Sequence, residues 1–398
     1  MLFNKHFLPL IGGIIAIGIV LMFPYKILPL LLGIIGMGAV VAFHELGHFL
    51  FCKLFKIRTP SFSIGFGPRL FTKQIGDTEF AISAIPLGGY VEIAGSAEVG
   101  QGEQKEAYST DTHSFATKPW IQKFLVMMGG IFFNIILSYF IFSLLYIAGM
   151  PKSLFLYPKN AIPTVAKVIP ASPAETAGIQ PGDTILKINE ISTADLSGTE
   201  LDTQISSRPN ETISFLIERA GAQQEIQVAL TQRDFFGTIK ASSGIIFAIA
   251  DMPGYPILEA IQKGIALTHE YIANTIRAFH YSITNTCTTT ISGPVQLIAT
   301  TTQTAQEGIK NFFLLLGIIS LSLAVFNLIP IPILDGGQLL FYTIEAIIRR
   351  PIPEKIREYI HIFCWLTFLV FILYISYREI LCIANPYLKT LWAFLGWE

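Results

Sequence analysis

The chain has 398 residues, of which 52% are hydrophobic and 14% are charged, whereas an ordinary soluble domain carries about 25% charged residues. Its 27 basic and 28 acidic side chains give a net charge of −1, which excludes strong electrostatic attraction to nucleic acid, so we expect no such partner. The high hydrophobicity also excludes intrinsic disorder. Because no CxxC pair occurs, we expect apolar packing, and neither disulfides nor a thiolate zinc site, at Cys52, Cys287, Cys364 and Cys382.

Five long runs contain no Asp, Glu, Lys or Arg. Each is near or above about 20 residues, the length at which a helix crosses the roughly 30 Å of hydrocarbon in a bilayer. The runs show no alternation, and only helices and closed barrels satisfy their own backbone groups in lipid, so we predict five transmembrane helices. The runs are His6–Tyr25, Ile27–Phe43, Phe124–Pro151, Asn311–Leu334 and Tyr359–Tyr377.

The positions of lysine and arginine predict the orientation of these helices. Residues 53–123 carry eight basic side chains, the link 346–358 carries four, and the turn between the first two runs carries only Lys26. Since cytoplasmic loops are the basic ones, both basic stretches are expected in the cytoplasm and residues 152–310 outside it. The first run has only Lys5 before it and no small-residue cleavage site, which favours a retained anchor over a signal peptide.

The runs and the polar stretches between them predict ten segments. The first four are an extra transmembrane anchor (1–26), a transmembrane helix with a histidine motif (27–55), a cytoplasmic-side, membrane-associated β-loop region (56–120) and a transmembrane helix (121–151). An extracytoplasmic region (152–255) and an amphipathic helix with a linker (256–310) follow. The last four are a transmembrane helix (311–345), a cytoplasmic link (346–358), a transmembrane helix (359–380) and an interfacial tail with Trp392 and Trp397 (381–398).

The polar stretches themselves predict two further structures. Residues 59–95 are rich in β-branched and aromatic residues separated by glycine, a pattern typical of hairpins. Residues 152–255 have the composition of a water-soluble α+β domain. The predicted fold class is a polytopic α-helical membrane protein with about five transmembrane helices, a membrane-associated β-hairpin loop and one extracytoplasmic α+β domain.

The chemistry is predicted from the segment Ala42–Phe49, which reads AFHELGHF. His44 and His48 are four residues apart, so they lie one turn apart on one helix face and can share a zinc ion. Zinc lowers the pKa of a bound water to about 7, and the neighbouring Glu45 can take the proton from that water. The alternative is a polar helix end that faces the lipid headgroups, but ionisable groups in membrane helices are costly and usually functional.

A third protein ligand is needed because catalytic zinc sites usually have three and keep one position for water. Asp335 is the best candidate, because it ends an apolar run that Pro330 and Pro332 break. The predicted topology places Asp335 and Glu45 at the same depth. A helix-capping aspartate before a Gly-Gly turn remains the alternative. The remaining histidines are interpreted as surface or interfacial residues: His6, His113, His269, His280 and His361.

His44-Glu-Leu-Gly-His48 on one membrane helix, with Asn327 and Leu334-Asp-Gly336 on a later one, resembles the site-2 protease family of intramembrane zinc metalloproteases. Several other segments resemble the family as well, over about residues 30–377, most closely in its bacterial type that cleaves anti-sigma factors. These are the membrane-dipping β-loop (Phe62–Gly67 and Pro86–Val91), a Gly-Pro-x-x-Asn signature with Ile131 in place of proline (Gly129–Asn134), and the segment before the aspartate helix (Ser292–Val295).

The resemblance implies roles for particular residues. Asp335 would be the third zinc ligand, and Asn327 and Asn134 would contribute to substrate binding. The backbone of Gly65, Phe66 and Gly67 would pair with an unwound substrate strand. The implied partners are single-span membrane proteins and the lipid bilayer, and the implied location is a bacterial inner membrane.

Residues Ser172–Asn189 carry a second motif. They predict a short helix closed by Gly178, a turn at Pro181–Gly182 and a strand that begins at Asp183. This arrangement resembles PDZ domains of bacterial envelope proteases, and the predicted module spans about 160–232. Another small β-sandwich is the alternative. A PDZ groove binds a peptide or chain terminus as an added strand, which would place the periplasmic partner here.

The function predicted from these features is that of a zinc endopeptidase that cleaves transmembrane segments of its substrates, for example an anti-sigma factor or remnant signal peptides. One alternative is a PDZ-bearing membrane scaffold with a non-catalytic metal site, but a structural zinc would require four protein ligands and only three are found. A metal transporter is disfavoured because the helices show no inverted repeats.

Overall fold

The protein is described here by a computed structural model that covers residues 24–96, 106, 109–235, 238–284, 293–350 and 352–394. The anchor predicted at 1–26 lies outside these residues except for its last three, as do Cys287 and Trp397, so these predictions are untested. The chain divides into two compact units. One contains the described residues up to Phe142, Ala266–Thr275 and those after residue 288; the other contains Ser143–Ile265 and the described residues from Ile276.

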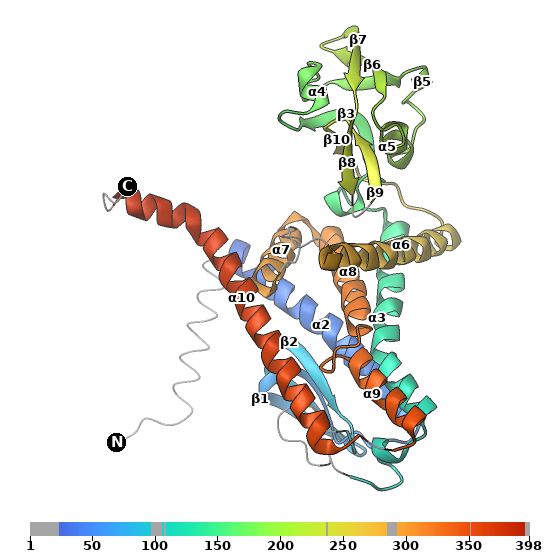
Figure 1. Ribbon diagram of the computed structural model, residues 1–398, viewed down its shortest axis with the longest axis vertical. Helices are drawn as coiled ribbons and strands as arrows, with labels where there is room; N and C mark the ends of the chain where they lie inside the picture. Colours follow the sequence, from blue (N-terminus) through green and yellow to red (C-terminus); the bar gives the residue numbers. More distant parts are fainter. Residues whose placement is uncertain are drawn as a thin grey trace. The chain divides into compact units, whose positions relative to one another are not determined.

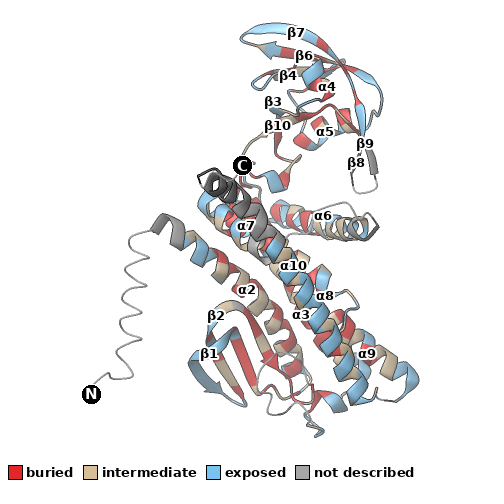
Figure 2. Ribbon diagram, turned by 60° about the vertical axis from the view of Figure 1, so that its left-hand side comes forward, coloured by how far each residue is buried: buried red, intermediate tan, exposed pale blue. Residues whose placement is uncertain are grey.

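Four helices in the described part of the chain are long and apolar enough to cross a membrane, and they match four of the five predicted runs (Figure 1). They are α2 (Pro24–Leu54), α3 (Trp120–Ala148), α8 (Ile309–Asn327) and α10 (Glu354–Phe394). Large apolar side chains point outward from them, such as Ile35 at 56% and Phe140 at 61% exposed, as expected of surfaces that face lipid. Exposed residues are dense along α10 (Figure 2).

Small and polar residues hold α2, α3 and α8 together inside this unit. Gly47 of α2 faces Gly129 of α3 so closely that a side chain on Gly47 would overlap the Gly129 backbone. Ser138 of α3 donates a hydrogen bond to the carbonyl of Gly317 in α8, at 2.9 Å. Close approach through glycine and interhelical hydrogen bonds from serine are the usual means of packing helices in lipid.

The structure adds detail to three predicted segments. The segment 311–345 is two helices, because α8 ends at Asn327 and α9 (Asp335–Ile348) begins after a turn that contains both prolines. The linker before it contains α7 (Pro294–Glu307), which begins with a proline in its first turn, a favoured position, and packs on α2. Helix α10 continues beyond residue 380, where the interfacial tail was predicted to begin, although its candidate membrane span ends at Tyr377.

The predicted β-loop is present as β1 (Ser61–Ile75) and β2 (Thr78–Glu92), each strand bent so that its parts pair with different segments. Ser61–Ile64 pairs with Glu79–Ile82 on one edge and with Gly89–Glu92 on the other. A buried apolar cluster joins the sheet to α2 and α3, and it contains Cys52, which is fully buried as predicted for an apolar packing residue. A 3-10 turn, η1 (Phe115–Thr117), contributes Phe115 to this cluster.

The second unit is built around a six-stranded antiparallel sheet. Its order is β10-β3-β4-β6-β7, with β5 paired to β4. The strands are β3 (Ala161–Val168), β4 (Thr184–Ile188), β5 (Ile191–Ser192), β6 (Thr212–Arg219), β7 (Ala222–Ala229) and β10 (Ile245–Ile249). The other elements are η2 (Leu154–Leu156), α4 (Pro173–Thr176), α5 (Gly198–Ser206) and the hairpin β8 (Thr231–Phe235) with β9 (Thr238–Ser242). Helix α6 (Ile257–Thr284), predicted at 256–284, has residues in both units.

The sheet has the alternation expected of a soluble core. Ile213, Phe215 and Ile217 of β6 are fully buried, whereas the residues between them are partly exposed. The sheet extends beyond residue 232, where the predicted module ends, because β10 pairs with β3. Strand β10 follows the β8–β9 hairpin, and the sequence of this hairpin does not indicate that the chain then adds another strand to the sheet.

Candidate metal centre

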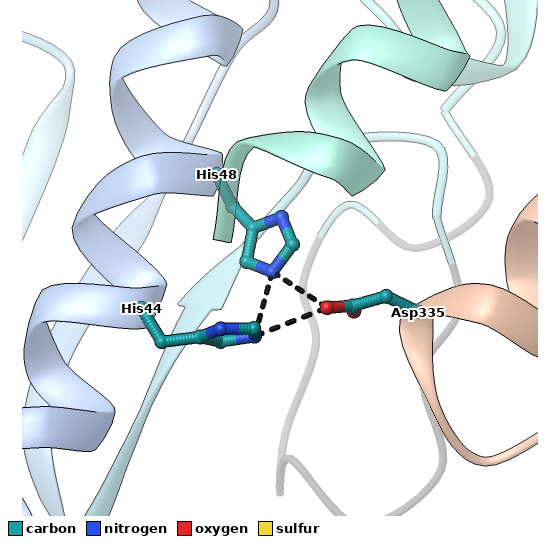
Figure 3. Close-up of side chains that lie close together, drawn as sticks. All are labelled: His44, His48 and Asp335. Atoms are coloured by element: carbon teal, nitrogen blue, oxygen red, sulfur yellow. Dashed lines mark hydrogen bonds and ion pairs between the residues drawn. The ribbon is translucent and has the colours of Figure 1, made fainter. Parts of the chain in front are cut away.

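The three predicted metal ligands meet at one point, as Figure 3 shows. Helix α2 presents both histidines on one face, and the first turn of α9 presents Asp335 opposite them. Nε2 of His44 lies 3.1 Å from Oδ2 of Asp335 and 3.1 Å from Nε2 of His48. Nε2 of His48 lies 3.5 Å from the same carboxylate oxygen. Both histidines are buried.

These distances test whether the residues suit zinc. Four ligands at 2.0–2.1 Å in a tetrahedron are separated from one another by about 3.3–3.4 Å. The three measured separations, 3.1, 3.1 and 3.5 Å, lie close to this value. Two imidazoles and one carboxylate are a donor set that catalytic zinc sites use, and they leave a fourth position for water. The arrangement therefore fits zinc.

His48 is oriented by the backbone of α3. Its Nδ1 lies 2.8 Å from the carbonyl oxygen of Val126, which can only accept, so Nδ1 carries the hydrogen. Nε2, which faces Asp335, is then the unprotonated nitrogen that a metal requires. No sequence signal could have identified Val126, because its side chain plays no part in this contact.

His44 needs the same arrangement, and Asn134 of α3 is its partner. Nδ1 of His44 lies 3.2 Å from Nδ2 of Asn134, whose Oδ1 is buried without a hydrogen-bond partner. If the Asn134 amide is turned by 180°, Oδ1 accepts a hydrogen from Nδ1 of His44, which leaves Nε2 of His44 free for a metal. Asn134 is fully buried. Its predicted role in substrate binding is untested, and its side chain lies beside the metal-ligand candidate His44.

Glycine allows α3 to approach this site. A methyl group on Gly130 would lie 2.5 Å from Nε2 of His48 and 2.7 Å from Nε2 of His44, which is closer than real Cβ atoms come. Only glycine therefore leaves room for both ring nitrogens. Gly336 and Gly337 play a similar part after Asp335, because their Cα atoms lie against backbone carbonyls of the turn at 328–331. Gly130 belongs to the signature segment Gly129–Asn134, but its role beside the histidines was not predicted, although a Gly-Gly pair in a membrane helix indicates close approach.

Glu45 lies next to the metal ligands and faces the sheet. Its side chain is close to the backbone of β2, where a Cβ built on Gly89 would lie 3.6 Å from Cγ of Glu45 and where Val91 supplies a backbone hydrogen bond. The family resemblance predicts that the backbone of Gly65–Gly67 pairs with substrate, and this prediction is untested. The structure places that segment against Ser83 and Ile85 of β2, with Phe66 stacked on Tyr90, so Gly89 and Val91 are the sheet residues beside Glu45.

Asn327 completes the surroundings of the site. It is the last residue of α8, and its Nδ2 lies 3.2 Å from Nε2 of His44. An amide so close to the ligand atoms can donate a hydrogen bond to an oxygen bound at the same place. This position agrees with a role near substrate, which remains a prediction.

Comparison with known proteins decides the family. The model of peptidase family M50 matches residues 32–372. The chain belongs to peptidase family M50. The match to three relatives of this M50 peptidase covers nearly the whole length of each relative. Each of them is named as a candidate zinc metalloprotease. A protein of Agrobacterium fabrum is 33% identical over 80% of this chain and 86% of its own. One of Clostridium perfringens is 30% identical over 86% and 95%. One of Vibrio cholerae is 26% identical over 80% and 90%.

These findings confirm the predicted family, enzyme class and metal. The M50 peptidase is a zinc metalloprotease of the site-2 protease family, and His44, His48 and Asp335 form the group that could hold its zinc. Its apolar helices make it a multi-pass membrane protein. The alternative of a non-catalytic scaffold is therefore not retained.

Proposed function

We propose that this M50 peptidase cleaves peptide bonds within the transmembrane segments of membrane proteins, such as a single-span anti-sigma factor or a remnant signal peptide. The observation that carries the proposal is the place of the ligands. His44 and His48 lie on an apolar helix long enough to cross a bilayer, and both are buried among other helices. A peptidase that acted only on soluble chains would gain nothing from ligands at this depth, where polar groups are costly.

Different residues would carry out different steps of peptide-bond hydrolysis. Zinc bound at this site would polarise the scissile carbonyl and lower the pKa of a bound water. Glu45 takes a proton from the attacking water and passes it to the leaving amine, since its carboxylate is adjacent to the ligands and can reach both. Asn327 donates a hydrogen bond to the oxygen of the scissile carbonyl from its position 3.2 Å from Nε2 of His44.

The substrate must be extended where it is cut, because the peptide groups of a helix are hydrogen-bonded to one another. Edges of the β1–β2 sheet offer unpaired backbone groups to such a segment. We place the extended substrate along this sheet, near Gly65–Gly67 and Gly89, because Gly89 lies beside Glu45 and Gly65–Gly67 pairs with the same strand, β2.

The test is to map the cleaved bond. The purified full-length enzyme is placed in lipid vesicles with a single-span substrate, and the products are identified by mass spectrometry. The expected cut lies inside the apolar segment, and enzyme treated with a zinc chelator gives none until zinc is restored. A soluble peptide from the region flanking the span is the comparison substrate. Cleavage of this peptide alone would contradict the proposal.

The proposed location is a bacterial inner membrane. The second unit, which contains the six-stranded sheet and is called the sheet unit below, would lie on the periplasmic side, and the first unit is called the membrane unit. Single cysteines are introduced at Thr117, Lys355 and Ser197 in a chain that lacks the four native cysteines, since all three positions are exposed. A thiol reagent that cannot cross membranes should label Ser197→Cys in intact cells and should not label the other two. Labelling at Lys355→Cys without labelling at Ser197→Cys would reverse the orientation.

We further propose that the sheet unit acts as a PDZ module. Its short helix α4, capped by Ser172 and ended by Gly178 in a left-handed conformation, followed by strand β4, supports this assignment. The sheet order ends at β10 and β7, which are the edges at which a peptide could be added as a strand. The module would either exclude substrates with bulky periplasmic domains or bind a newly trimmed chain terminus.

The structure defines a clean way to remove the module. The nitrogen of Ala250 donates to the carbonyl of Asn160 at 2.9 Å, so residues 161–249 can be replaced by a short glycine linker. Under size exclusion, the shortened enzyme cleaves a full-length substrate faster and a pre-trimmed one equally fast. Under terminus binding, the pre-trimmed substrate shows a higher half-saturation concentration at a similar maximal rate. Loss of all cleavage in a zinc-loaded enzyme would contradict both versions.

A further inference from the structure

A second polar site lies at the other end of the helix that carries Asp335. A surface cavity of about 280 Å³ is formed where the first turn of α3 meets the last turns of α9. Ten residues, or about 15 Å of helix, separate Asp335 from Glu345 at its wall, so the cavity is distinct from the metal centre. Its walls are formed mainly by Trp120, Lys123, Tyr342, Glu345, Arg349 and Arg350.

The cavity has an excess of positive charge. Lys123, Arg349 and Arg350 line it, and none of them is in an ion pair among the described residues. The one carboxylate at the wall, Glu345, is already used, because it accepts hydrogen bonds from the Arg357 guanidinium and from the backbone nitrogen of Ile352. Lys123 feels the charge of Glu345, which is already ion-paired with Arg357, and neither Arg349 nor Arg350 has a carboxylate partner among the described residues. The net positive charge around the cavity suits an anionic ligand with several oxygen acceptors, such as a phosphate group.

The rings in the wall hold part of this arrangement in place. The ammonium group of Lys123 lies 5.5 Å from the centre of the Tyr342 ring and 5.7 Å from that of Phe115, which restricts where the charge can go. The indole nitrogen of Trp120 donates to the hydroxyl of Thr343 at 3.2 Å, which fixes α3 against α9. The cavity is therefore a feature of two packed helices and does not depend on a loop.

The depth of the cavity indicates the source of the phosphate. Trp120 is the first residue of a candidate membrane span, and the span in α10 begins at Lys355, so the cavity lies at helix ends, where lipid headgroups are found. Apolar side chains lie directly beside it in the sequence. Ile347 is 75% exposed and Ile348 is 59% exposed, although both fall between wall residues Ala346 and Arg349. A free phosphate ion has no use for such a surface, whereas acyl chains do.

We propose that this cavity binds the headgroup of an anionic phospholipid, with its phosphate among Lys123, Arg349 and Arg350 and its acyl chains along the exposed isoleucines of α9. Basic pockets between membrane helices are suited to such headgroups. The bound lipid would join the ends of α3 and α9, the two helices that supply Asn134 and Asp335 to the metal centre.

The test uses the purified full-length enzyme after removal of its lipid. Native mass spectrometry counts the molecules of phosphatidylglycerol or phosphatidylcholine that the enzyme retains over a titration. We expect one tightly bound phosphatidylglycerol and no equivalent phosphatidylcholine. The double variant Arg349→Gln/Arg350→Gln should weaken this binding roughly 30-fold, because each cation near anionic lipid contributes about a factor of five.

The control variant is Lys118→Gln/Lys355→Gln, which removes two cations from the same end of the helices but outside the cavity. It should retain the tight lipid. Equal losses in the two double variants would show only general surface charge and overturn the proposal. Displacement of the lipid by millimolar inorganic phosphate would show a free-anion site and would overturn it as well. Zinc content, measured in every variant, confirms that the membrane unit is folded and separates this test from that of the proposed peptidase activity.

Discussion

The two units of this M50 peptidase use polar residues in opposite ways. In the sheet unit the core is apolar, and polar groups face outward, as for Ile213, Phe215 and Ile217 of β6 and the residues between them. In the membrane unit large apolar side chains face outward, and buried polar groups gather between the helices at His44, His48 and Asn134. Because each polar group buried in lipid is costly, those that remain indicate chemistry.

This difference shows in which unit a buried polar side chain indicates function. The buried Asp183 in the sheet unit is paired with Arg219 and has a purely structural explanation. The buried imidazoles in the membrane unit have partners on one ring nitrogen and present the other nitrogen to Asp335. The comparison predicts that changes in the membrane unit alter zinc binding and catalysis, whereas changes in the sheet unit alter its own stability.

The largest effect is expected at Glu45. Glu45→Gln should retain zinc, because all three ligands remain, and should reduce cleavage about 10²–10⁴-fold, the typical contribution of a positioned general base. Asp335→Ala should lower zinc content and cleavage together. Cleavage rate and zinc content by mass spectrometry separate the two cases, and Glu259→Gln on the surface of α6 is the matched control. Full cleavage by Glu45→Gln enzyme would rule out the proposed role of the carboxylate.

The next effect is expected from the space that Gly130 leaves. Gly130→Ala adds a methyl group that would lie 2.5 Å from Nε2 of His48 and 2.7 Å from Nε2 of His44, which is too close. Zinc affinity should fall by at least the roughly 10–100-fold that follows the loss of a group orienting a ligand. Gly33→Ala is the control, because its methyl group would meet its neighbours at 3.4–3.5 Å, an ordinary contact. Affinity is measured by competition with a chelator of known strength, and equal affinities in the two variants would refute the steric argument.

The sequence predicted the ligands because their spacing has a direct geometric meaning. Residues four apart on a helix share a face, so His44 and His48 could be assigned from their spacing alone. The aspartate needed more, since its place depends on how α9 packs against α2. The broken apolar run and the predicted depth favoured Asp335 as a ligand, and the family resemblance supported this over a helix-capping role. The membrane helices were predictable because hydrophobic length alone determines them.

What the sequence could not predict depends on contacts between distant segments. The carbonyl of Val126 orients His48 without any side-chain signal. The bend in α8–α9 and the helix α7 were missed because charge-free runs and polar linkers do not show where backbone hydrogen bonds end. Strand β10 was missed for a related reason, since it begins at Ile245, 84 residues after the start of its partner β3 at Ala161.

A smaller effect is expected from Asn134, and it tests the amide orientation. Asn134→Leu removes the acceptor for Nδ1 of His44 while keeping the volume, and it should weaken zinc binding about 10–100-fold. Asn134→Asp restores an acceptor that cannot donate, so it should bind zinc much better than the leucine variant. Chelator competition gives the affinities, and thermal unfolding of the zinc-free proteins controls for packing. Equal weakening in both variants would mean that Asn134 does not act through an acceptor atom.

The smallest effect on catalysis is expected in the sheet unit, at Asp183 and Arg219. Burial of the Asp183 carboxyl by itself raises its pKa, but hydrogen bonds from Arg219 and from the backbone nitrogen of Gln180 outweigh burial and hold the pKa below the ordinary 3.8. A lowered pKa in the folded state means that this group stabilises the unit above about pH 4, and that the contribution is lost as the pH falls through the lowered pKa.

Arg219→Gln should therefore destabilise residues 161–249 at pH 7 and make their stability depend less on pH below 4. Hydrogen exchange in the full-length enzyme over a urea series at pH 7 and pH 3 measures both. Zinc content and the initial cleavage rate at pH 7 should stay at wild-type values, because the pair is part of the sheet core and supplies nothing to the metal ligands. Lys187→Gln, an exposed cation on the neighbouring strand β4, is the control for the change in net charge. If zinc content fell in Arg219→Gln enzyme while the sheet stayed protected, the division of labour between the two units would be wrong, since a purely structural ion pair in one unit would then be controlling the metal in the other.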